Sequence, residues 1–404
     1  MPAAGLRLST HNRPVLPHPF FFLASLAWNF ALGMTWLAVP LYAYSQGLSN
    51  AEIGTLFALP VLAQAPLNLV GGAYTDRIGG RRIMLGSCVA TSVAGVWLMF
   101  AHGFWMLLAG QVGLILARAA FWPATWAMAS ELPGARGVQL GRLNAVTNFG
   151  QIMGTTLCGF LLAAAGFQPT FAVLSAIGVV ALIAALGTQA QPPKVVPPRH
   201  VLASYLPLLR ERIIAYSIVC AYLSALPFSL TMSFYPVLLA QYGYAEGVSG
   251  VLLALRAVGS IGASLLVARL VHTGPQSLWP VGCGIAVAAS VGLLPTVNHI
   301  APIAFWMLVV GAGTAAMTLY FQITIAEASR QEERGSALAL GGMGWSVSHL
   351  TTPLVMGFLA DRYGIVVGFY ALGAFALVCA VAIVFLRQWA FGTRPGNRPE
   401  IKRP

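Results

Sequence analysis

The sequence predicts an all-α membrane protein with 12 transmembrane helices in two pseudo-symmetric six-helix bundles. Three observations support this prediction. The mean hydropathy is +0.78, and 58% of the 404 residues are apolar while only 8% are charged, which lies outside the range of soluble domains. Twelve apolar runs are each long enough to cross a bilayer as a helix, which takes about 20 residues. The second half of the chain also repeats the first.

Short connections separate the apolar runs, which fall into two sets of six. The first run is too long for a signal peptide and no small-residue cleavage site follows it, so we expect a retained helix. A proline-rich stretch after the sixth run predicts a linker between two halves. We expect an N-terminal tail (1–19), a first bundle (20–190), a linker (191–211), a second bundle (212–388) and a C-terminal tail (389–404). The expected helices are 20–46, 50–73, 82–102, 104–131, 137–164, 168–190, 212–242, 246–271, 277–296, 300–329, 335–361 and 365–388.

Lys and Arg residues predict the orientation of the helices. If both termini are cytoplasmic, all but three of the 22 Lys and Arg residues fall on the cytoplasmic side. Arg362 then lies outside, and Arg118 and Arg256 lie within spans. This is the bias that the positive-inside rule describes. It accounts for the net charge of +12, and because the basic residues are spread over many loops, no nucleic-acid partner is expected. We expect a multi-pass protein of a cell membrane, the bacterial inner membrane.

Matching residues recur between the halves at a nearly constant shift. At a shift of 196 residues Pro40 falls on Pro236, and at a shift of 198 Gly159–Leu161 falls on Gly357–Leu359. Both halves begin on the same side of the membrane, so they are parallel repeats about an axis along the membrane normal. Repeats of this kind characterise transporters that rock about a site near the bilayer midplane.

A charged, glycine-rich segment joins the second and third expected helices, GGAYTDRIGGRR at 71–82. Glycine permits tight turns and close helix approach. The segment resembles motif A of the major facilitator superfamily, G-x-L-A-D-R-x-G-R-K/R, which occupies the same place between helices 2 and 3. Tyr74 and Gly80 depart from the pattern. The matching residues are Gly72, Asp76, Arg77, Gly79 and Arg81.

This resemblance covers essentially the whole chain and implies a secondary transporter with the fold of that superfamily. It also implies a conformational latch, in which Asp76 interacts with the N-terminus of helix 11 at Gly335–Ser336. The corresponding turn of the second half has Val271 in place of the acid. Two further patterns are kept only in part: Arg118 alone remains of motif B in helix 4, and Thr155 replaces the proline of motif C in helix 5.

Polar side chains within the expected spans are candidates for a site, since ionisable groups at membrane depth are costly. None of the ten acidic residues falls at mid-span. Two arginines and one histidine do, and histidine is the side chain that changes charge near neutral pH. Helix 5 carries a polar stripe on one face, and the repeat places His349 at the position of Gln151. The candidates are Arg118, His349, Arg256, Asn29, Gln111, Asn144, Asn148, Gln151, Trp122, Tyr222 and Gln322.

Each candidate also has a structural interpretation. Asn and Gln in membrane helices often join neighbouring helices by hydrogen bonds worth about 1 kcal/mol. Arg118 would then be a partner of backbone carbonyls or of Gln111, Arg256 an anchor between the halves, and His349 a satisfied interior histidine. The five cysteines lie in apolar runs without metal-ligand spacing. We therefore expect no metal, no cofactor and no disulfide framework.

The expected function is secondary active transport of a small molecule, because no nucleotide-binding sequence is visible and an ion gradient must supply the energy. Proton-coupled export of a metabolite, siderophore or drug is the first expectation, with Arg118 and His349 as coupling residues. The positive interior favours an anionic or metal-chelating compound over a cationic drug. Import of an organic anion or metal chelate is the alternative. No metal cluster or nucleophile elbow suggests an enzyme, and we expect a monomer in the lipid bilayer.

Overall fold

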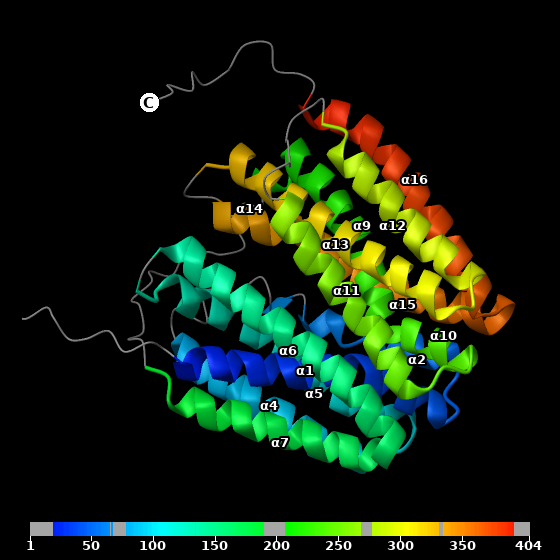
Figure 1. The fold of residues 1–404 in the computed structure, drawn as a ribbon. Helices are drawn as coiled ribbons and strands as arrows, with labels where there is room; N and C mark the ends of the chain where they lie inside the picture. The colour runs from blue at the N-terminus through cyan, green and yellow to red at the C-terminus, as the bar shows by residue number, and fades with distance from the viewer. Residues whose placement is uncertain are drawn as a thin grey trace, which may run out of the picture.

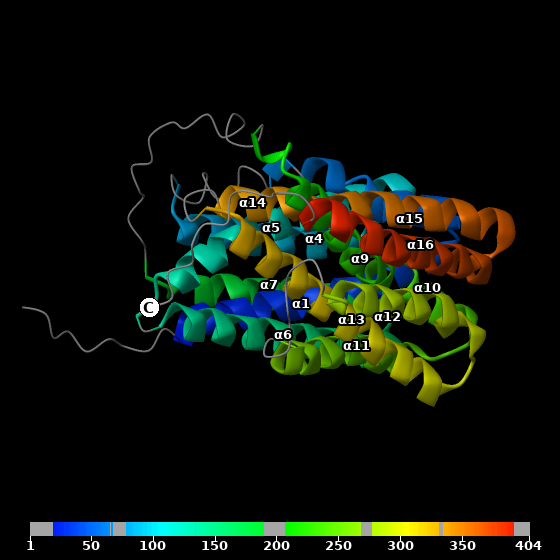
Figure 2. The same cartoon turned by 90° about the horizontal axis from the view of Figure 1, so that it is seen from above.

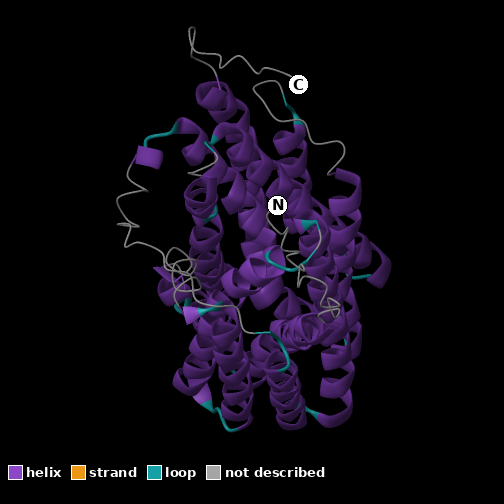
Figure 3. Cartoon of the chain, turned by 90° about the vertical axis from the view of Figure 1, so that its left-hand side faces the viewer, coloured by secondary structure: helices purple, strands orange, loops and turns teal. Residues whose placement is uncertain are grey.

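The computed structural model describes residues 19–64, 66–67, 78–133, 135–189, 207–267, 277–330 and 334–391. Within these ranges every regular element is a helix (Figure 3). Ten helices in this part of the chain are long and apolar enough to cross a membrane, which confirms the predicted fold class. The helices are α1 (Pro19–Ser45), α2 (Asn50–Ala58), α4 (Gly80–Met99), α5 (Gly103–Ser130), α6 (Arg136–Ala165), α7 (Phe167–Leu186), α9 (Arg212–Ser233), α10 (Tyr235–Gln241), α11 (Glu246–Val267), α12 (Trp279–Leu293), the 3-10 turn η1 (Leu294–Thr296), α13 (Ile300–Ala328), α14 (Arg334–Gly341), α15 (Met343–Tyr363) and α16 (Ile365–Phe391).

Two groups of helices lie side by side (Figures 1 and 2). In Figure 1 the two groups diverge towards the left and come together at the right, near α2 and α10. The group from α1 to α7 forms the first half, and the group from α9 to α16 forms the second. In the first half α1 packs on α6 and α4 on α7. In the second half α9 packs on α15 and α12 on α16. These are equivalent pairings in the order of the expected spans, so the sequence repeat corresponds to a repeat in the fold.

Three expected spans are not single long helices in the described residues. The span 50–73 is described only as far as residue 67. The span 212–242 is divided between α9 and α10 at Phe234, because Pro236, in the first turn of α10, has no N–H to donate to the preceding turn. The span 335–361 is divided between α14 and α15 at Gly342. Most of the expected tails and of the expected linker lie outside the described residues, and the domain boundaries stay a prediction. The last helix α16 continues to Phe391, three residues into the expected C-terminal tail.

The two halves touch closely at one end of the molecule, which we call the closed end. There α6 meets α11 and α2 meets α15. A Cβ atom on Gly159 of α6 would collide with the carbonyl oxygen of Glu246 in α11, and one on Gly357 of α15 would collide with the carbonyl oxygen of Asn50 in α2. Glycine is therefore required for these backbones to approach.

A carboxylate joins the halves at the closed end. Asp361, near the C-terminus of α15, accepts hydrogen bonds from the backbone N–H groups of Asn50 at 2.8 Å and Ala51 at 2.9 Å. These groups open α2, where N–H groups lack partners within the helix. The negative charge also complements the positive end of the helix dipole. The contact fixes the two halves around the space between them.

Candidate functional site

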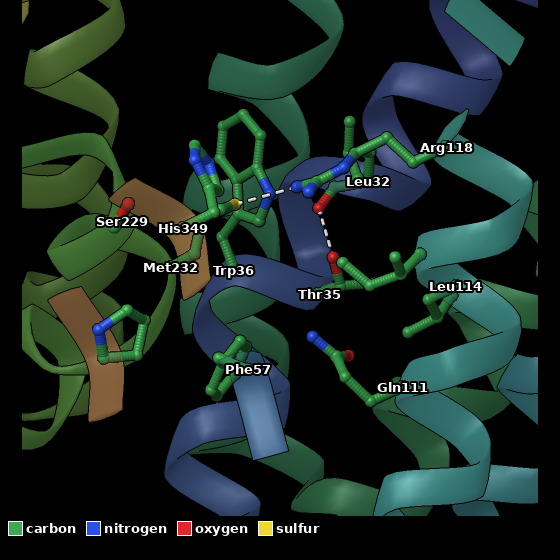
Figure 4. Close-up of a pocket in the computed structure, with 12 residues that line it drawn as sticks. Leu32, Thr35, Trp36, Phe57, Gln111, Leu114, Arg118, Ser229, Met232 and His349 are labelled. Carbon is green, nitrogen blue, oxygen red and sulfur yellow. Dashed lines mark hydrogen bonds between the residues drawn. The ribbon is translucent and has the colours of Figure 1, made fainter. Parts of the chain in front are cut away.

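A cavity lies between the halves and is lined by residues from both (Figure 4). It contains about 440 Å³ of empty space, including solvent at its mouth. Three sequence-predicted site residues, Gln111, Arg118 and His349, are part of its lining. The cavity therefore combines a few polar groups with an apolar wall. The lining residues are Leu32, Thr35, Trp36, Phe57, Gln111, Leu114, Ile115, Arg118, Ser229, Met232, His349 and Pro353.

Arg118, from the middle of α5, brings a positive charge to this cavity. Its side chain is only 9% exposed. Nη2 donates to the amide oxygen of Gln64 at 2.8 Å. Nη1 lies 3.2 Å from the sulfur of Met232, a contact that Figure 4 shows. Both partners are neutral, and a thioether is a weak acceptor. No carboxylate among the described residues pairs with Arg118, although buried charges are normally paired. An anion in the cavity would supply the missing charge.

His349, from α15, belongs to a row of rings that we call the aromatic wall: Trp36, Phe228, Trp345 and His349. Ring centroids are 5.3 Å apart between Trp36 and Phe228, 5.4 Å between Phe228 and Trp345, and 5.5 Å between Trp345 and His349. Nδ1 of His349 lies 2.7 Å from the carbonyl oxygen of Trp345. Because a carbonyl only accepts, Nδ1 carries the hydrogen, and Nε2 of the neutral ring is left as the acceptor. His349 therefore brings a ring nitrogen that can act as an acceptor to the same cavity as Arg118.

Arg256, from α11, lies behind the aromatic wall. Its Cζ atom is 4.6 Å from the ring centroid of Phe228 and 5.3 Å from that of Trp36. The side chain is 4% exposed, and its Nε atom has no hydrogen-bond partner among the described residues. Arg256 is not part of the cavity lining. The second expected cation is thus close to the cavity but separated from it by rings.

Gln111 lies on α5 two turns before Arg118 and faces the same cavity. Its Oε1 atom is buried and has no hydrogen-bond donor in the described part of the chain. The interpretation of Arg118 as a partner of Gln111 is not seen in this structure, where Gln64 takes that place. Gln111 thus adds a polar group to the cavity that a bound molecule can use.

Asn29 and Gln151 bind each other instead of lining the cavity. Nε2 of Gln151 donates to Oδ1 of Asn29 at 3.0 Å, and Nδ2 of Asn29 donates to the carbonyl oxygen of Ser25 at 2.9 Å. Nearby, Oγ1 of Thr155 donates to the carbonyl oxygen of Gly33 at 3.0 Å. These bonds join α1 to α6 inside the first half. They fit the structural interpretation of the polar stripe, and a substrate role for these residues stays a prediction.

The five remaining candidates also lie outside the cavity lining. Nδ2 of Asn148 donates to the carbonyl oxygen of Asn144 at 2.8 Å within α6. The hydroxyl of Tyr222 lies 3.0 Å from that of Thr351 in α15. Trp122 packs edge-on against Trp28 with centroids 6.4 Å apart, and Gln322 is exposed. Their roles in binding are untested. The five are Asn144, Asn148, Trp122, Tyr222 and Gln322.

Motif A is described only in its last residues. Gly72, Asp76 and Arg77 lie outside the described residues, so the latch stays a prediction. Gly79 has φ = 91°, a conformation that favours glycine, and it precedes α4. Nη2 of Arg81 donates to the carbonyl oxygen of Leu186 at 2.6 Å, which ties the start of α4 to the end of α7 within one half.

Several contact residues of the site were not among the sequence candidates. Gln64 is a polar residue inside an apolar run and could have been selected on that ground. Phe228, Met232 and Trp345 carry no signal, because apolar side chains in a membrane helix look alike in sequence whether they face lipid, core or cavity. Asp361 lies at a helix end, and only the packing of α15 on α2 gives it a partner.

The fold and the cavity define the class of the protein. Two similar helical halves around a charged cavity form the architecture of a membrane transporter, in which the substrate site lies between the repeats. The family model of the Major Facilitator Superfamily matches residues 21–310 and 296–404. The chain belongs to this superfamily, as the motif A resemblance implied.

Known proteins similar to parts of this chain include a quinolone resistance protein and a probable sulfoacetate transporter. The quinolone resistance protein NorA of Staphylococcus aureus is 23% identical over 154 residues, which is 38% of this chain and 39% of NorA. The probable sulfoacetate transporter SauU of Cupriavidus necator is 26% identical over 145 residues, which is 35% of this chain and 34% of SauU. Both matches therefore span less than two fifths of the relatives' length.

Two solved structures share the fold along nearly the whole chain. A bacterial homolog of the human lysosomal transporter Spinster, in an inward-facing and unoccupied conformation, gives a TM-score of 0.76 at 18% identity over 94% of this chain and 98% of that one. The nucleoside transporter NupG gives a TM-score of 0.76 at 12% identity over 93% and 99%. At these identities the likeness concerns the fold alone.

Proposed function

We propose that this chain is a secondary transporter that carries a small organic anion together with a proton, and that Arg118 binds the anion. The observation that carries this proposal is the guanidinium of Arg118, which is buried in the cavity with only Gln64 and Met232 as partners. An anion that replaces these weak partners gains charge-assisted hydrogen bonds, and a guanidinium can form two of them in parallel with one carboxylate or sulfonate.

The charge of the cavity argues against a cationic substrate. A cation would meet Arg118 at close range in a poorly hydrated space, where repulsion is weakly screened. An anionic substrate is also consistent with the name of SauU, a probable sulfoacetate transporter that is similar to part of this chain, since sulfoacetate is an organic anion. A chelate with carboxylate groups, such as a siderophore, belongs to the same chemical class.

Proton coupling follows from the shared cavity of Arg118 and His349. A proton on His349 adds positive charge beside the anion and strengthens its binding. By linkage, the anion then favours protonation of His349 to the same extent. Ligands that strengthen each other's binding travel in the same direction, so the coupling is symport. An inward proton gradient would drive uptake, which was the alternative expectation from the sequence.

Export is the second candidate direction. It is supported by the partial similarity to NorA, whose name connects it with quinolone resistance. In an exporter driven by the same gradient, the proton and the substrate compete for the cavity. The proton on His349 and the anion would then have to weaken each other's binding. The direction of the substrate flux therefore distinguishes the two candidates.

The membrane placement belongs to the same proposal. The bias of Lys and Arg residues supports cytoplasmic termini, and the bacterial relatives support the inner membrane. With this orientation the closed end, where Asp361 meets α2, faces the outside. The cavity then communicates with the cytoplasmic side in this state, and we propose that a monomer is the transporting unit.

Mass spectrometry of cells that lack the gene tests the proposal. Culture medium and cell interior are compared with those of cells complemented by the wild type or by Arg118→Gln, with iron plentiful and scarce. We expect an organic anion that remains in the medium and is missing inside the deletion strain, with import restored by the wild type and not by Arg118→Gln.

The same experiment includes a control variant, Arg362→Gln, and has outcomes that would contradict the proposal. Arg362→Gln removes an exposed arginine at the end of α15 and should restore import fully. An anion retained inside the cells and lost from the medium would establish export in place of uptake. A neutral or cationic compound, or full activity of Arg118→Gln, would contradict the proposal.

A further inference from the structure

We propose that the transported compound carries two anionic groups, one bound by Arg118 and the other by Arg256. This inference rests on the proposed function and extends it. The first argument is the charge balance of the interior. Arg118 and Arg256 are both buried, and no carboxylate among the described residues pairs with either. A bound dianion balances both charges, whereas a monoanion leaves one of them uncompensated at membrane depth.

The two arginines contact neighbouring positions on one helix. Arg118 meets Met232 of α9, and Arg256 lies over Phe228 of the same helix. These positions are four residues apart, about one helical turn or 6 Å along the axis. Two guanidinium groups that approach the same face of α9 at this spacing suit the two ends of one small molecule.

The backbone that carries Arg256 is fixed. A Cβ atom on Gly311 of α13 would collide with the carbonyl oxygen of Arg256, so the two helices touch at this point. One turn further along α11, Oγ of Ser260 donates to the carbonyl oxygen of Gly311 at 3.0 Å. Because α11 is held by α13, only the flexible side chain of Arg256 has to move to reach the cavity.

The present partners of Arg256 are exchangeable. Phe228 and Trp36 offer cation–π contacts, which are weaker than the charge-assisted hydrogen bonds that a carboxylate provides. Trp36 belongs to α1 of the first half, whereas Arg256 belongs to the second. Relative motion of the halves changes this contact, and Trp36 also lines the cavity. The side chain is thus held beside the site by groups that a second anionic group of the substrate can replace.

The guanidinium of Arg256 differs from those of the arginines that join helices. Arg81 and Arg387 each donate from a guanidinium nitrogen to a backbone carbonyl oxygen, whereas Arg256 contacts rings. Nε of Arg256 has no hydrogen-bond partner among the described residues. The buried donor is left for a ligand, and its position behind Trp36 and Phe228 keeps it out of water until the ligand is bound.

Binding of two matched probes to the purified full-length protein tests the inference. Isophthalate has two carboxylates on a ring and benzoate has one, and both are titrated by calorimetry. We expect isophthalate to bind the wild type at least about tenfold more tightly than benzoate. Arg256→Gln should lose about tenfold for isophthalate and change the affinity for benzoate by less than about threefold. Arg256→Lys, which keeps the charge, should recover part of the isophthalate affinity.

The outcomes separate this inference from the proposed function. If isophthalate and benzoate bind the wild type equally, or if Arg256→Gln leaves the isophthalate affinity unchanged, the dianion inference is wrong while an anion site at Arg118 stands. If neither probe binds the wild type, the proposed function fails and the inference fails with it. Arg362→Gln is the matched control and should bind both probes like the wild type. Monodisperse elution of each variant in detergent confirms that it is folded.

Discussion

Arg118 keeps its charge in the interior with two neutral partners, the amide oxygen of Gln64 and the sulfur of Met232. His349 shares its cavity and presents a ring whose Nδ1 is occupied by the carbonyl oxygen of Trp345. The remaining nitrogen of this ring is left as an acceptor in the cavity that also holds the positive charge of Arg118. In the proposed function, this nitrogen takes up the coupled proton when an anion is bound beside Arg118.

His349→Gln should separate anion transport from proton coupling. Glutamine has a similar size and can form hydrogen bonds, but it does not titrate. With a pH difference of 1 unit and one proton per anion, the wild type should accumulate the anion about tenfold. The variant should equilibrate the anion to equal concentrations on both sides. Uptake into proteoliposomes with an imposed pH gradient measures the accumulation ratio. Unchanged accumulation by His349→Gln would mean that another group carries the proton.

At the scale of helices, contacts between elements give a structural role to residues that the sequence selects as site candidates. Gln151, in the polar stripe of α6, donates to Asn29 and joins α6 to α1, while its role in substrate binding stays a prediction. Gly154 of α6 lies against the backbone of Phe30 in α1. Close packing through glycine brings the amides of both helices within hydrogen-bonding distance, so this face has a structural function in the first half.

Gln151→Leu should therefore lower stability without changing selectivity. Asn29 is fully buried, and its amide oxygen would lose the donor that it has now, at a cost of about 1 kcal/mol. We expect a melting temperature about 2 °C lower and an anion affinity within about twofold of the wild type. Thermal unfolding followed by fluorescence measures the first quantity. Gln322→Leu, at an exposed position, is the control and should not lower the melting temperature. A large loss of anion affinity in Gln151→Leu would instead indicate that Gln151 takes part in substrate binding.

Asp361 closes one end of the molecule, and its removal should open that end. Asp361→Ala leaves two N–H groups at the start of α2 without their acceptor, so the closed state loses about 1.4 kcal/mol or more and the open state gains about tenfold in population. The population of the open state can be followed with a single cysteine at Thr35, which lines the cavity, in a variant without the five native cysteines. Its labelling by an impermeant thiol reagent added outside intact cells should be about tenfold faster.

Glu52→Ala is the matched control for Asp361→Ala. Glu52 caps the same helix through the backbone N–H of Ser49 at 2.8 Å, but this bond stays within the first half. Its loss should weaken the helix end without opening the cavity to the outside. If both variants increase labelling equally, general loosening of α2 explains the effect and the bridge between halves does not.

Sequence patterns predicted the fold far better than the site. Apolar runs, the repeat and motif A gave the helical class and the superfamily, because each spans many residues and a single deviation changes little. The pairing of Arg118 with Gln64, in contrast, depends on how the segment that follows α2 packs on α5. The position of Arg256 behind Phe228 depends on the contact of α9 with α11. Such tertiary contacts leave no periodic trace in the sequence.

At the scale of the whole molecule, two similar halves enclose a cavity that is lined by an arginine from one half and a histidine from the other. The contacts at the closed end join α6 to α11 and α2 to α15, while Arg118 comes from the first half and His349 from the second. Rocking of the halves about this site would expose it alternately to the two faces of the membrane. The central claim is that an anion is bound by Arg118 during this motion.

Counterflow in proteoliposomes tests this claim most directly. Vesicles that contain the purified protein are loaded with an unlabelled compound and placed in a trace of the same compound in radiolabelled form. The anions benzoate, isophthalate and sulfoacetate are compared with the cation tetraphenylphosphonium. We expect transient accumulation of at least one anion with the wild type and with Arg362→Gln, and none with Arg118→Gln. Counterflow of the cation alone, or of an anion with Arg118→Gln at the rate of the wild type, would contradict the claim.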